Sequence, residues 1–261
     1  MRTSVATFST HKDGGAAADY EDAAASNPSV PDDDEVPGEQ ITVAVADGAS
    51  ESLLAGRWAR LLVEEFSQAE PLTDGSAFAA IAIRAAKRWR GVYTTYVDER
   101  LAGGRPIRWY EEPGLARGAY ATLLVAHFTE SGGWNAAALG DSCLFQVRDN
   151  HLHAAFPLQS DADFSIRPDL LGSRDPDAEL IAERATLISG VWEQGDQFFL
   201  CTDALAAWFL AAHASGEAPW AVLGDLGTDA GPGNFDSWVT GLRINGRMRN
   251  DDVTLVRVHM W

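Results

Sequence analysis

Short acidic motifs lie where the predicted strands of this sequence begin or end. Asp47-Gly48 follows the β-branched run ITVAVA, and Asp203 follows the apolar run FFLCT at the start of a predicted helix. Asp251-Asp252 comes directly before the last predicted strand, and Glu21-Asp22 precedes a loop rich in proline and aspartate. Because strand ends can meet on one rim of a sandwich, these carboxylates can converge on one place, where their mutual repulsion requires a cation.

Oxygen ligands of this kind favour a hard divalent cation such as Mg²⁺ or Mn²⁺, which keeps several bound waters. A water shared by two such ions is a source of hydroxide near neutral pH, and two ions can clamp a phosphoryl group. Each motif taken alone is more often an ordinary turn. The combination of the motifs therefore carries the interpretation, and a single Asp-Gly does not.

The hydrophobic periodicity of the chain changes between strand-like and helix-like stretches. Alternating or β-branched runs predict strands, and apolar stripes at helical spacing predict helices. Gly132-Gly133, Gly140-Asp141 and Asp149-Asn150 separate four consecutive strand-like runs, a pattern typical of an antiparallel meander. The predicted strands are residues 4–9, 41–46, 119–128, 134–139, 143–147, 152–156, 186–191, 197–201 and 253–259, and the predicted helices are residues 53–66, 78–96, 203–213, 219–226 and 235–242.

These elements imply an α+β fold, a four-layer α-β-β-α sandwich with two mainly antiparallel sheets. Residues 1–261 form a single domain in this interpretation, because the Pro- and Asp-rich loop 27–40 is too short to link two domains. Ser50 is the predicted cap of the first helix, and Asp74 lies near the start of the second. Residues 159–179 are predicted to be an irregular excursion. One basic cluster is predicted to be a solvated helix face: Arg84, Lys87, Arg88 and Arg90.

Composition excludes several classes of function. Hydrophobic residues make up 46 % of the 261, enough for a substantial core, and the formal net charge is −18. So negative a surface repels phosphate backbones, which argues against nucleic acid and anionic membranes as partners. No apolar run reaches membrane-spanning length and no signal peptide is visible, so a cytoplasmic protein is expected. Cys143 and Cys201 lie in apolar runs without an arginine six positions later, which disfavours a cysteine-nucleophile phosphatase.

The order of the motifs resembles the motif series of the protein phosphatase 2C family. The series here is Glu-Asp, Asp-Gly-Ala-Ser, Gly-x-Tyr-Ala-Thr, Ala-Leu-Gly-Asp-Ser, Leu-Cys-Thr-Asp-Ala and Asn-Asp-Asp-Val-Thr, and it runs from about Lys12 to Val258. The most specific pieces are AALGDSCLFQVRDNHL at residues 137–152 and NDDVTLV at residues 250–256. The resemblance implies hydrolysis of phosphoserine or phosphothreonine in a phosphoprotein substrate, with two Mn²⁺ or Mg²⁺ ions as cofactors.

The resemblance also implies roles for individual residues. Asp47 would bridge both ions, with the carbonyl of Gly48 touching one of them. Asp203 and Asp251 would bind the first ion.

Two further acidic motifs complete the implied metal set. Glu21 and Asp22 would hold the second ion, directly or through water. Asp141 lies in the Gly-Asp-Ser turn, near the position of a possible third metal, and could equally be a turn residue that caps the hairpin. His11 is the histidine nearest this set and is a minor candidate for an acid, and His151 and His153 fit a hairpin surface better than a metal site.

This chain departs from the family pattern at several positions. Some members have a histidine after Asp-Gly as a candidate general acid, where this chain has Ala49, so a water on the metal would have to protonate the leaving group. An aspartate is usual where Ala207 stands, which puts a third ion in doubt. The arginine that usually binds the substrate phosphate is replaced by Ala17, and Lys12 is the nearest cation, so Lys12 is the predicted phosphate contact. If Lys12 does not fill this role, the candidates are Arg57, Arg247 and Arg249.

Two other functions stay open on the sequence. One is a catalytically silent module of the same fold that binds or regulates a partner, and the other is a phosphomonoesterase for small molecules. The retention of every expected carboxylate argues against the first, because such repulsion is costly without a cation. A haloacid-dehalogenase-type enzyme is excluded, because Asp251-Asp252 is adjacent and lies near the C-terminus. The sequence carries no indication of oligomeric state.

Overall fold

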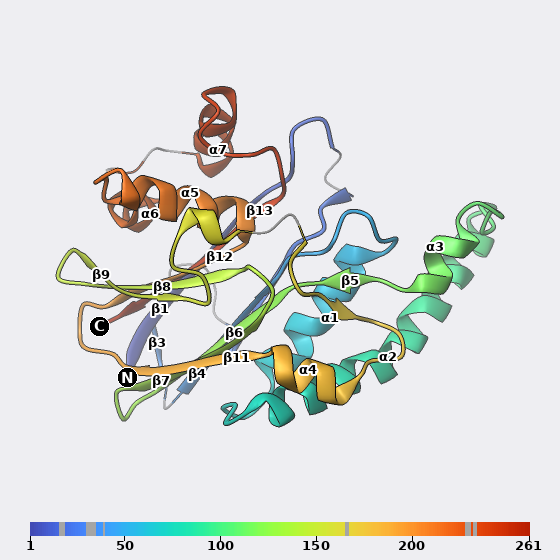
Figure 1. The fold of residues 1–261 in the computed structure, drawn as a ribbon, viewed down its shortest axis with the longest axis horizontal. Helices are drawn as coiled ribbons and strands as arrows, with labels where there is room; N and C mark the ends of the chain where they lie inside the picture. Colours follow the sequence, from blue (N-terminus) through green and yellow to red (C-terminus); the bar gives the residue numbers. More distant parts are fainter. Residues whose placement is uncertain (16–18, 30–34, 39, 165–166, 228–230, 232–233) are drawn as a thin grey trace.

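Two antiparallel sheets lie face to face, and helices cover both outer faces (Figure 1). The computed structural model describes residues 1–15, 19–29, 35–38, 40–164, 167–227, 231 and 234–261. This is the α-β-β-α sandwich with mainly antiparallel sheets that the periodicity predicts. Among the described residues, no helix has the length and apolar character needed to cross a membrane.

The strands divide into two large sheets and one short pair. The first sheet has the order β3 (Glu35–Pro37), β1 (Arg2–Thr10), β13 (Val253–Met260), β12 (Gln197–Cys201), β8 (Cys143–Arg148) and β9 (His151–Phe156). The second sheet has the order β11 (Thr186–Val191), β7 (Gly133–Leu139), β6 (Leu123–Thr129), β4 (Gln40–Ala46) and β2 (Ala23–Asn27). The short pair joins β5 (Tyr120–Ala121) to β10 (Leu171–Gly172).

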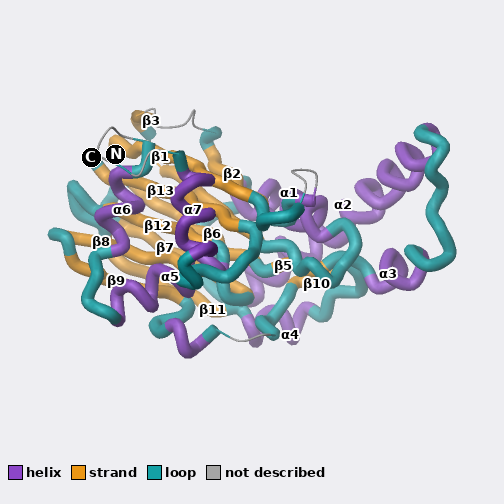
Figure 2. Tube along the Cα trace, turned by 90° about the horizontal axis from the view of Figure 1, so that it is seen from above, coloured by secondary structure: helices purple, strands orange, loops and turns teal. Residues whose placement is uncertain are grey.

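The helices form two groups that pack on different sheets. On the second sheet lie α1 (Ala55–Ser67), α2 (Gly75–Ala102) and α4 (Ala178–Arg184), and on the first lie α5 (Asp203–Ala214), α6 (Pro219–Asp225) and α7 (Phe235–Ile244). The C-terminal half of α2 and the short α3 (Glu112–Arg117) extend away from the sandwich (Figure 2).

Alternation of side chains along the strands builds three apolar layers. In β12, Phe198 and Leu200 face the other sheet, whereas Phe199 and Cys201 face the helices. Both faces of this strand are therefore covered, which explains its continuous apolar run. Cys143 and Cys201 are buried free thiols in the layer beneath α5, as the sequence predicts.

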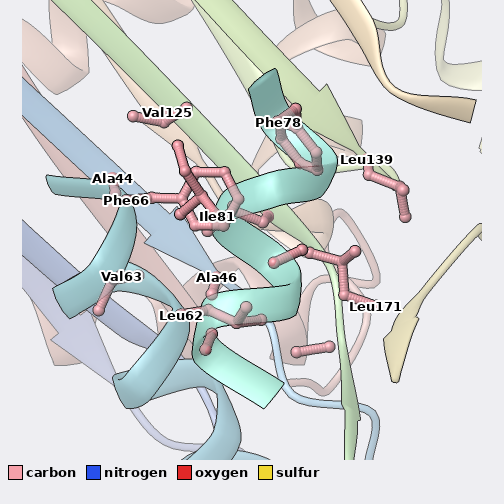
Figure 3. Packing of buried hydrophobic residues seen from close by; sticks show 14 of the residues in the cluster. Ala44, Ala46, Leu62, Val63, Phe66, Phe78, Ile81, Val125, Leu139 and Leu171 are labelled. Carbon is pink, nitrogen blue, oxygen red and sulfur yellow. The ribbon is translucent and has the colours of Figure 1, made fainter. Parts of the chain in front are cut away.

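The helical layer on the second sheet is held by aromatic contacts between α1 and α2. The rings of Phe66 and Phe78 lie 4.8 Å apart, centroid to centroid, among the apolar side chains of β4 and β6 (Figure 3). Asp74 caps α2, since its side chain accepts a hydrogen bond from the amide of Ala77 at 2.8 Å. The predicted cap of α1 is wrong, because the residue at the N-cap is Leu54, which makes no side-chain hydrogen bond, and Ser50 bonds to Glu21 instead.

The predicted meander is wrong at its middle turn. The pairs β6–β7 and β8–β9 form as expected, but β7 and β8 lie in different sheets. The chain crosses between the sheets at Gly140-Asp141, where Gly140 has φ +112° and an added Cβ would lie 2.5 Å from Cβ of Thr122. Only glycine fits this crossing.

Other differences concern segments with weak local signals. The predicted surface loop 27–40 contains β3, and part of it lies outside the described residues. The predicted excursion 159–179 contains a 3₁₀ turn at Asp161–Asp163, the strand β10 and the start of α4.

The basic cluster on α2 is not simply a solvated face. Arg84 and Arg88 both bond to Glu65 of α1, whose side chain is only 8 % exposed. These hydrogen bonds and positive charges lower the pKa of Glu65, although burial acts in the opposite direction. The cluster therefore neutralises a buried carboxylate between two helices.

Candidate metal and phosphate site

Asp47 directly follows β4, at the rim of the sandwich where that strand ends. Its carbonyl accepts a hydrogen bond from the amide of Thr122 at 2.8 Å, and its amide donates to the Thr122 hydroxyl at 3.3 Å. Gly48 then forms a bridge to Ala121. A Cβ on Gly48 would lie 2.6 Å from the carbonyl oxygen of Glu21, so the close approach of these two acidic motifs requires glycine here.

A cleft of about 720 Å³ opens beside Asp47. Asp203 from the start of α5 and Asp251 from the turn before β13 line it together with Asp47 and Gly48. The structure therefore brings together the bridging residue and the two ligands that the sequence predicts for the first ion. Arg117 and Arg167 also line this cleft, and no motif in the sequence marked either arginine.

Asp22 is buried behind this cleft, with a side chain that is only partly satisfied. Its Oδ2 accepts hydrogen bonds from the hydroxyls of Thr202 at 3.0 Å and Thr254 at 2.8 Å. Its Oδ1 is buried and has no hydrogen-bond partner among the described residues. The Oδ1 atoms of Asp141 and Asp203 are also buried, and neither has a hydrogen-bond partner among the described residues. Buried carboxylate oxygens without donors are costly, and a cation is the partner that suits them.

Electrostatics at Asp47 indicate that these carboxylates share one environment. Burial raises the pKa of Asp47 well above its usual range. The negative charges of Asp22, Asp251 and Asp141 raise this pKa further. Burial likewise raises the pKa of Asp141. Four carboxylates from four separate segments thus oppose one another's ionisation, which is the arrangement that a divalent cation stabilises.

Arg249 is a cation that forms ion pairs with these carboxylates. Its guanidinium bonds to Asp203, and its Nε lies 3.6 Å from Oδ2 of Asp251. Of the three arginines that the sequence offers as alternative phosphate contacts, Arg249 is the one at the carboxylates. Arg57 pairs with Glu99, and Arg247 pairs with Glu217.

Lys12 and Glu21 form a second acidic-basic unit at the edge of the cleft. The Nζ of Lys12 lies 3.0 Å from Oε2 of Glu21 and 2.9 Å from Oγ of Ser50. Although burial lowers the pKa of Lys12, the hydrogen bond and charge of Glu21 raise it overall. Lys12 does not line the cleft that contains Asp47, and faces a neighbouring cavity instead.

Asp252 positions this unit, a role that the sequence motif did not reveal. Its two carboxylate oxygens accept hydrogen bonds from the backbone amides of Lys12 and Glu21, each at 2.8 Å. The end of β1 and the segment before β2 are thereby attached to the turn that carries Asp251. Ala17, the position of the usual arginine, lies outside the described residues. His11 is exposed and its Nδ1 lies 3.0 Å from the carbonyl oxygen of Lys12.

The donor set fits a hard divalent cation. It consists of carboxylate oxygens, several of them buried without a hydrogen-bond donor, and their proton affinity is raised by mutual repulsion. In the described part of the chain, no three His, Cys, Asp or Glu side chains lie close enough together to enclose a metal as they stand.

Comparison with known proteins identifies the fold. No protein-family model matches the sequence, and no curated protein matches it. The Mycobacterium tuberculosis serine/threonine phosphatase PstP/Ppp superposes with a TM-score of 0.54 at 16 % identity, over 100 % of this chain and 99 % of that one. The chain has the protein phosphatase 2C fold.

Other structures of this fold give the same result over the whole chain. The serine/threonine phosphatase of S. agalactiae superposes with a TM-score of 0.56 at 13 % identity, over 99 % of this chain and 100 % of that one. RsbX, solved in complex with magnesium, superposes with a TM-score of 0.52 at 13 % identity, over 100 % and 96 %. In this fold, Asp47, Asp203 and Asp251 line one cleft.

The buried position of Asp22 predicts an unusual pH dependence of stability. Burial raises the pKa of Asp22 to about 7, although hydrogen bonds from Thr254 and Thr202 favour its charged form. A carboxyl with a folded-state pKa above its unfolded value near 4 binds its proton more tightly in the folded state, so its stabilising contribution is complete below pH 4 and is lost as the pH rises to 7.

The metal-free protein is therefore expected to lose up to about 1.4 kcal/mol of unfolding free energy per pH unit between pH 4 and 7 through this group. Urea unfolding in EDTA measures the loss. Asp22→Asn should flatten the slope, whereas Asp149→Asn, in an exposed turn, should not. An equal slope in wild type and Asp22→Asn would show that Asp22 does not titrate in this range.

Proposed function

We propose that this chain hydrolyses phosphoserine and phosphothreonine in proteins, using two Mg²⁺ or Mn²⁺ ions held by its acidic rim. The observation that carries the proposal is the set of buried carboxylate oxygens without donors around Asp47. The fold supports it, and the catalytic domain of PstP, which superposes with a TM-score of 0.54 at 17 % identity, was solved in complex with two manganese ions.

The position of each acidic residue determines which ion it would hold. Asp47, Asp203 and Asp251 line the cleft and would hold the first ion, with Asp47 shared and the Gly48 carbonyl beside it. Glu21 and Asp22 would hold the second ion, and Asp141, whose buried Oδ1 has no donor, would be near a third. When bound, such ions polarise a phosphoryl group and lower the pKa of water.

The substrate phosphate needs positive charge from the protein as well. Lys12 is the proposed point charge, and its bond to Ser50 places its ammonium group at the border of the cleft. Arg249 is a further candidate, because it already lies within the carboxylate group. Ala49 carries no proton donor, so no side chain at that position can protonate the leaving alkoxide.

The test is turnover of an aryl phosphate and of a phosphothreonine peptide with Mn²⁺ or Mg²⁺ at neutral and mildly alkaline pH. We expect hydrolysis of both substrates, and its loss in EDTA with recovery on adding Mn²⁺. Hydrolysis of small phosphates without peptide activity would replace the protein substrate by a small phosphomonoester. Absence of turnover with either ion would overturn the proposal.

One observation favours a second candidate, a silent module that binds a partner. Arg249 supplies a positive charge to Asp203 and Asp251 from within the chain, so part of the repulsion is relieved without a metal. Such a module would bind Mn²⁺ weakly or not at all. Isothermal titration with Mn²⁺ separates the two candidates, because the enzyme requires saturable binding that survives mutation of Arg249.

A further inference from the structure

A second cavity, of about 790 Å³, lies beside the catalytic cleft. The start of α1, the C-terminal half of α2 and residues 19–21 before β2 form its walls. Ser50 lines both the cleft and this cavity, so the two are separated by little more than one side chain. We call this space the basic cavity.

The charge of the basic cavity is opposite to that of the whole protein. Five basic side chains line it against three acidic ones, although the chain carries a formal net charge of −18. The basic ones are Lys12, Arg57, Arg60, Arg100 and Arg105. The catalytic cleft next to it is lined by the carboxylates of Asp47, Glu51, Asp203 and Asp251. Neighbouring spaces of opposite charge can hold two different parts of one ligand.

Two of these cations are engaged in holding the cavity together. Arg57 lies 2.7 Å from Oε2 of Glu99, and Arg100 contacts both carboxylate oxygens of Glu111 at 3.0 and 3.1 Å. Both guanidinium groups also lie over the ring of Tyr96, at 5.2 and 5.6 Å from its centroid. These contacts connect α1, α2 and the chain before α3 into one wall.

The two other arginines of the basic cavity do not take part in these contacts. Arg60 and Arg105 are exposed, and neither guanidinium pairs with a carboxylate within the described part of the chain. The rest of the protein is net negative and repels an acidic ligand, whereas these two arginines attract it. Guanidinium groups also match the planar carboxylate with two parallel hydrogen bonds.

We propose that the basic cavity binds acidic residues of the phosphoprotein substrate that lie close in sequence to the phosphorylated residue. This inference rests on the proposed function, since it requires the phosphate to occupy the cleft. An extended peptide advances about 3.3 Å per residue, so a carboxylate about two to four residues from the phosphorylated one spans the border at Ser50. The chain thereby selects acidic phosphosites, with Arg60 and Arg105 as the specificity-determining residues.

The experiment compares phosphothreonine peptides whose flanking positions carry either Asp and Glu or Asn and Gln. In Mn²⁺ at low ionic strength, acidic flanks on one side should raise kcat/KM about fivefold or more, the size expected for screened ion pairs. The double variant Arg60→Ala, Arg105→Ala should lose this preference. The double variant Lys87→Ala, Arg90→Ala should keep it, since it removes the same charge from α2 at a different cavity.

Aryl phosphate provides the internal control. Its kcat/KM should be equal in all three proteins, because it does not reach the basic cavity. Equal turnover of acidic and neutral peptides by the wild type, or an undiminished preference in the Arg60, Arg105 variant, would overturn the inference while leaving the phosphatase intact. If no substrate is hydrolysed, the proposed function fails instead. Binding of an unphosphorylated acidic peptide to the metal-free protein, weakened only in the Arg60, Arg105 variant, would then support the cavity by itself.

Discussion

Asparagine in place of Asp47 is expected to abolish metal-dependent hydrolysis while leaving the fold intact. Loss of the shared ligand removes a contribution of several kcal/mol from the ions, so kcat/KM should fall on the order of 10²–10³-fold or more. The stability of the metal-free protein should stay equal or rise, because burial and the charges of Asp22 and Asp251 already oppose the ionised form of Asp47.

The same variant should respond less to metal in thermal unfolding. Mn²⁺ that binds only the folded wild type raises its melting temperature, and Asp47→Asn should reduce that shift. Asp149→Asn is the matched control, because it removes a carboxylate from an exposed turn far from the rim. An Asp47→Asn protein that is unfolded, or one that keeps full activity, would show that Asp47 is a structural residue or is not part of the site.

Alanine in place of Arg249 is expected to change metal binding and substrate turnover in opposite directions. Arg249 competes with cations for Asp203 and Asp251, so its removal should lower the Kd for Mn²⁺ by about three- to tenfold, a modest change because the arginine is 44 % exposed. In the wild type, a metal that binds Asp203 and Asp251 releases the guanidinium of Arg249, which can then contact the substrate phosphate. Its loss should then lower kcat/KM by about tenfold or more.

Titration calorimetry with Mn²⁺ and steady-state kinetics on the same variant separate the two effects. Arg247→Ala is the control, since Arg247 pairs with the exposed Glu217 at 2.7 Å and does not approach the rim. An unchanged Kd for Mn²⁺ would show that Arg249 is not a competitor of the metal. Unchanged kcat/KM would return the phosphate contact to Lys12 alone.

Much of the fold could be predicted because it depends on local periodicity. Alternation of side chains has period two in any strand, so the runs 197–201 and 253–259 were recognisable as β12 and β13 to within a residue or two. The apolar stripes of α1 and α2 face one sheet and were likewise recognisable, although α2 (Gly75–Ala102) extends beyond the predicted 78–96 at both ends. Segments with weak patterns, such as β2 and α4, were missed because pairing and packing, and not propensity, stabilise them.

Local patterns do not determine how distant segments pair. Consecutive runs that look like one meander divide between two sheets, because the turn at Gly140-Asp141 crosses the sandwich and each strand finds its partner by burial. The acidic motifs were visible in the sequence, but their grouping on one rim depends on contacts such as those of Asp252 with Lys12 and Glu21, more than 200 residues away.

The basic residues near the site show most clearly what the sequence determines and what only the tertiary structure determines. The sequence pointed to Lys12 by its nearness to the Glu21 motif along the chain, and the structure does place these two side chains together. Arg117 and Arg167 line the cleft of Asp47 from other segments, and Arg249 bonds to Asp203 there. Arg60 and Arg105 both line the neighbouring cavity. Residue types and local periodicity determined which chemistry is possible, because they act over a few residues. Tertiary packing alone decided which charges face one another, because charges interact through space and not along the chain.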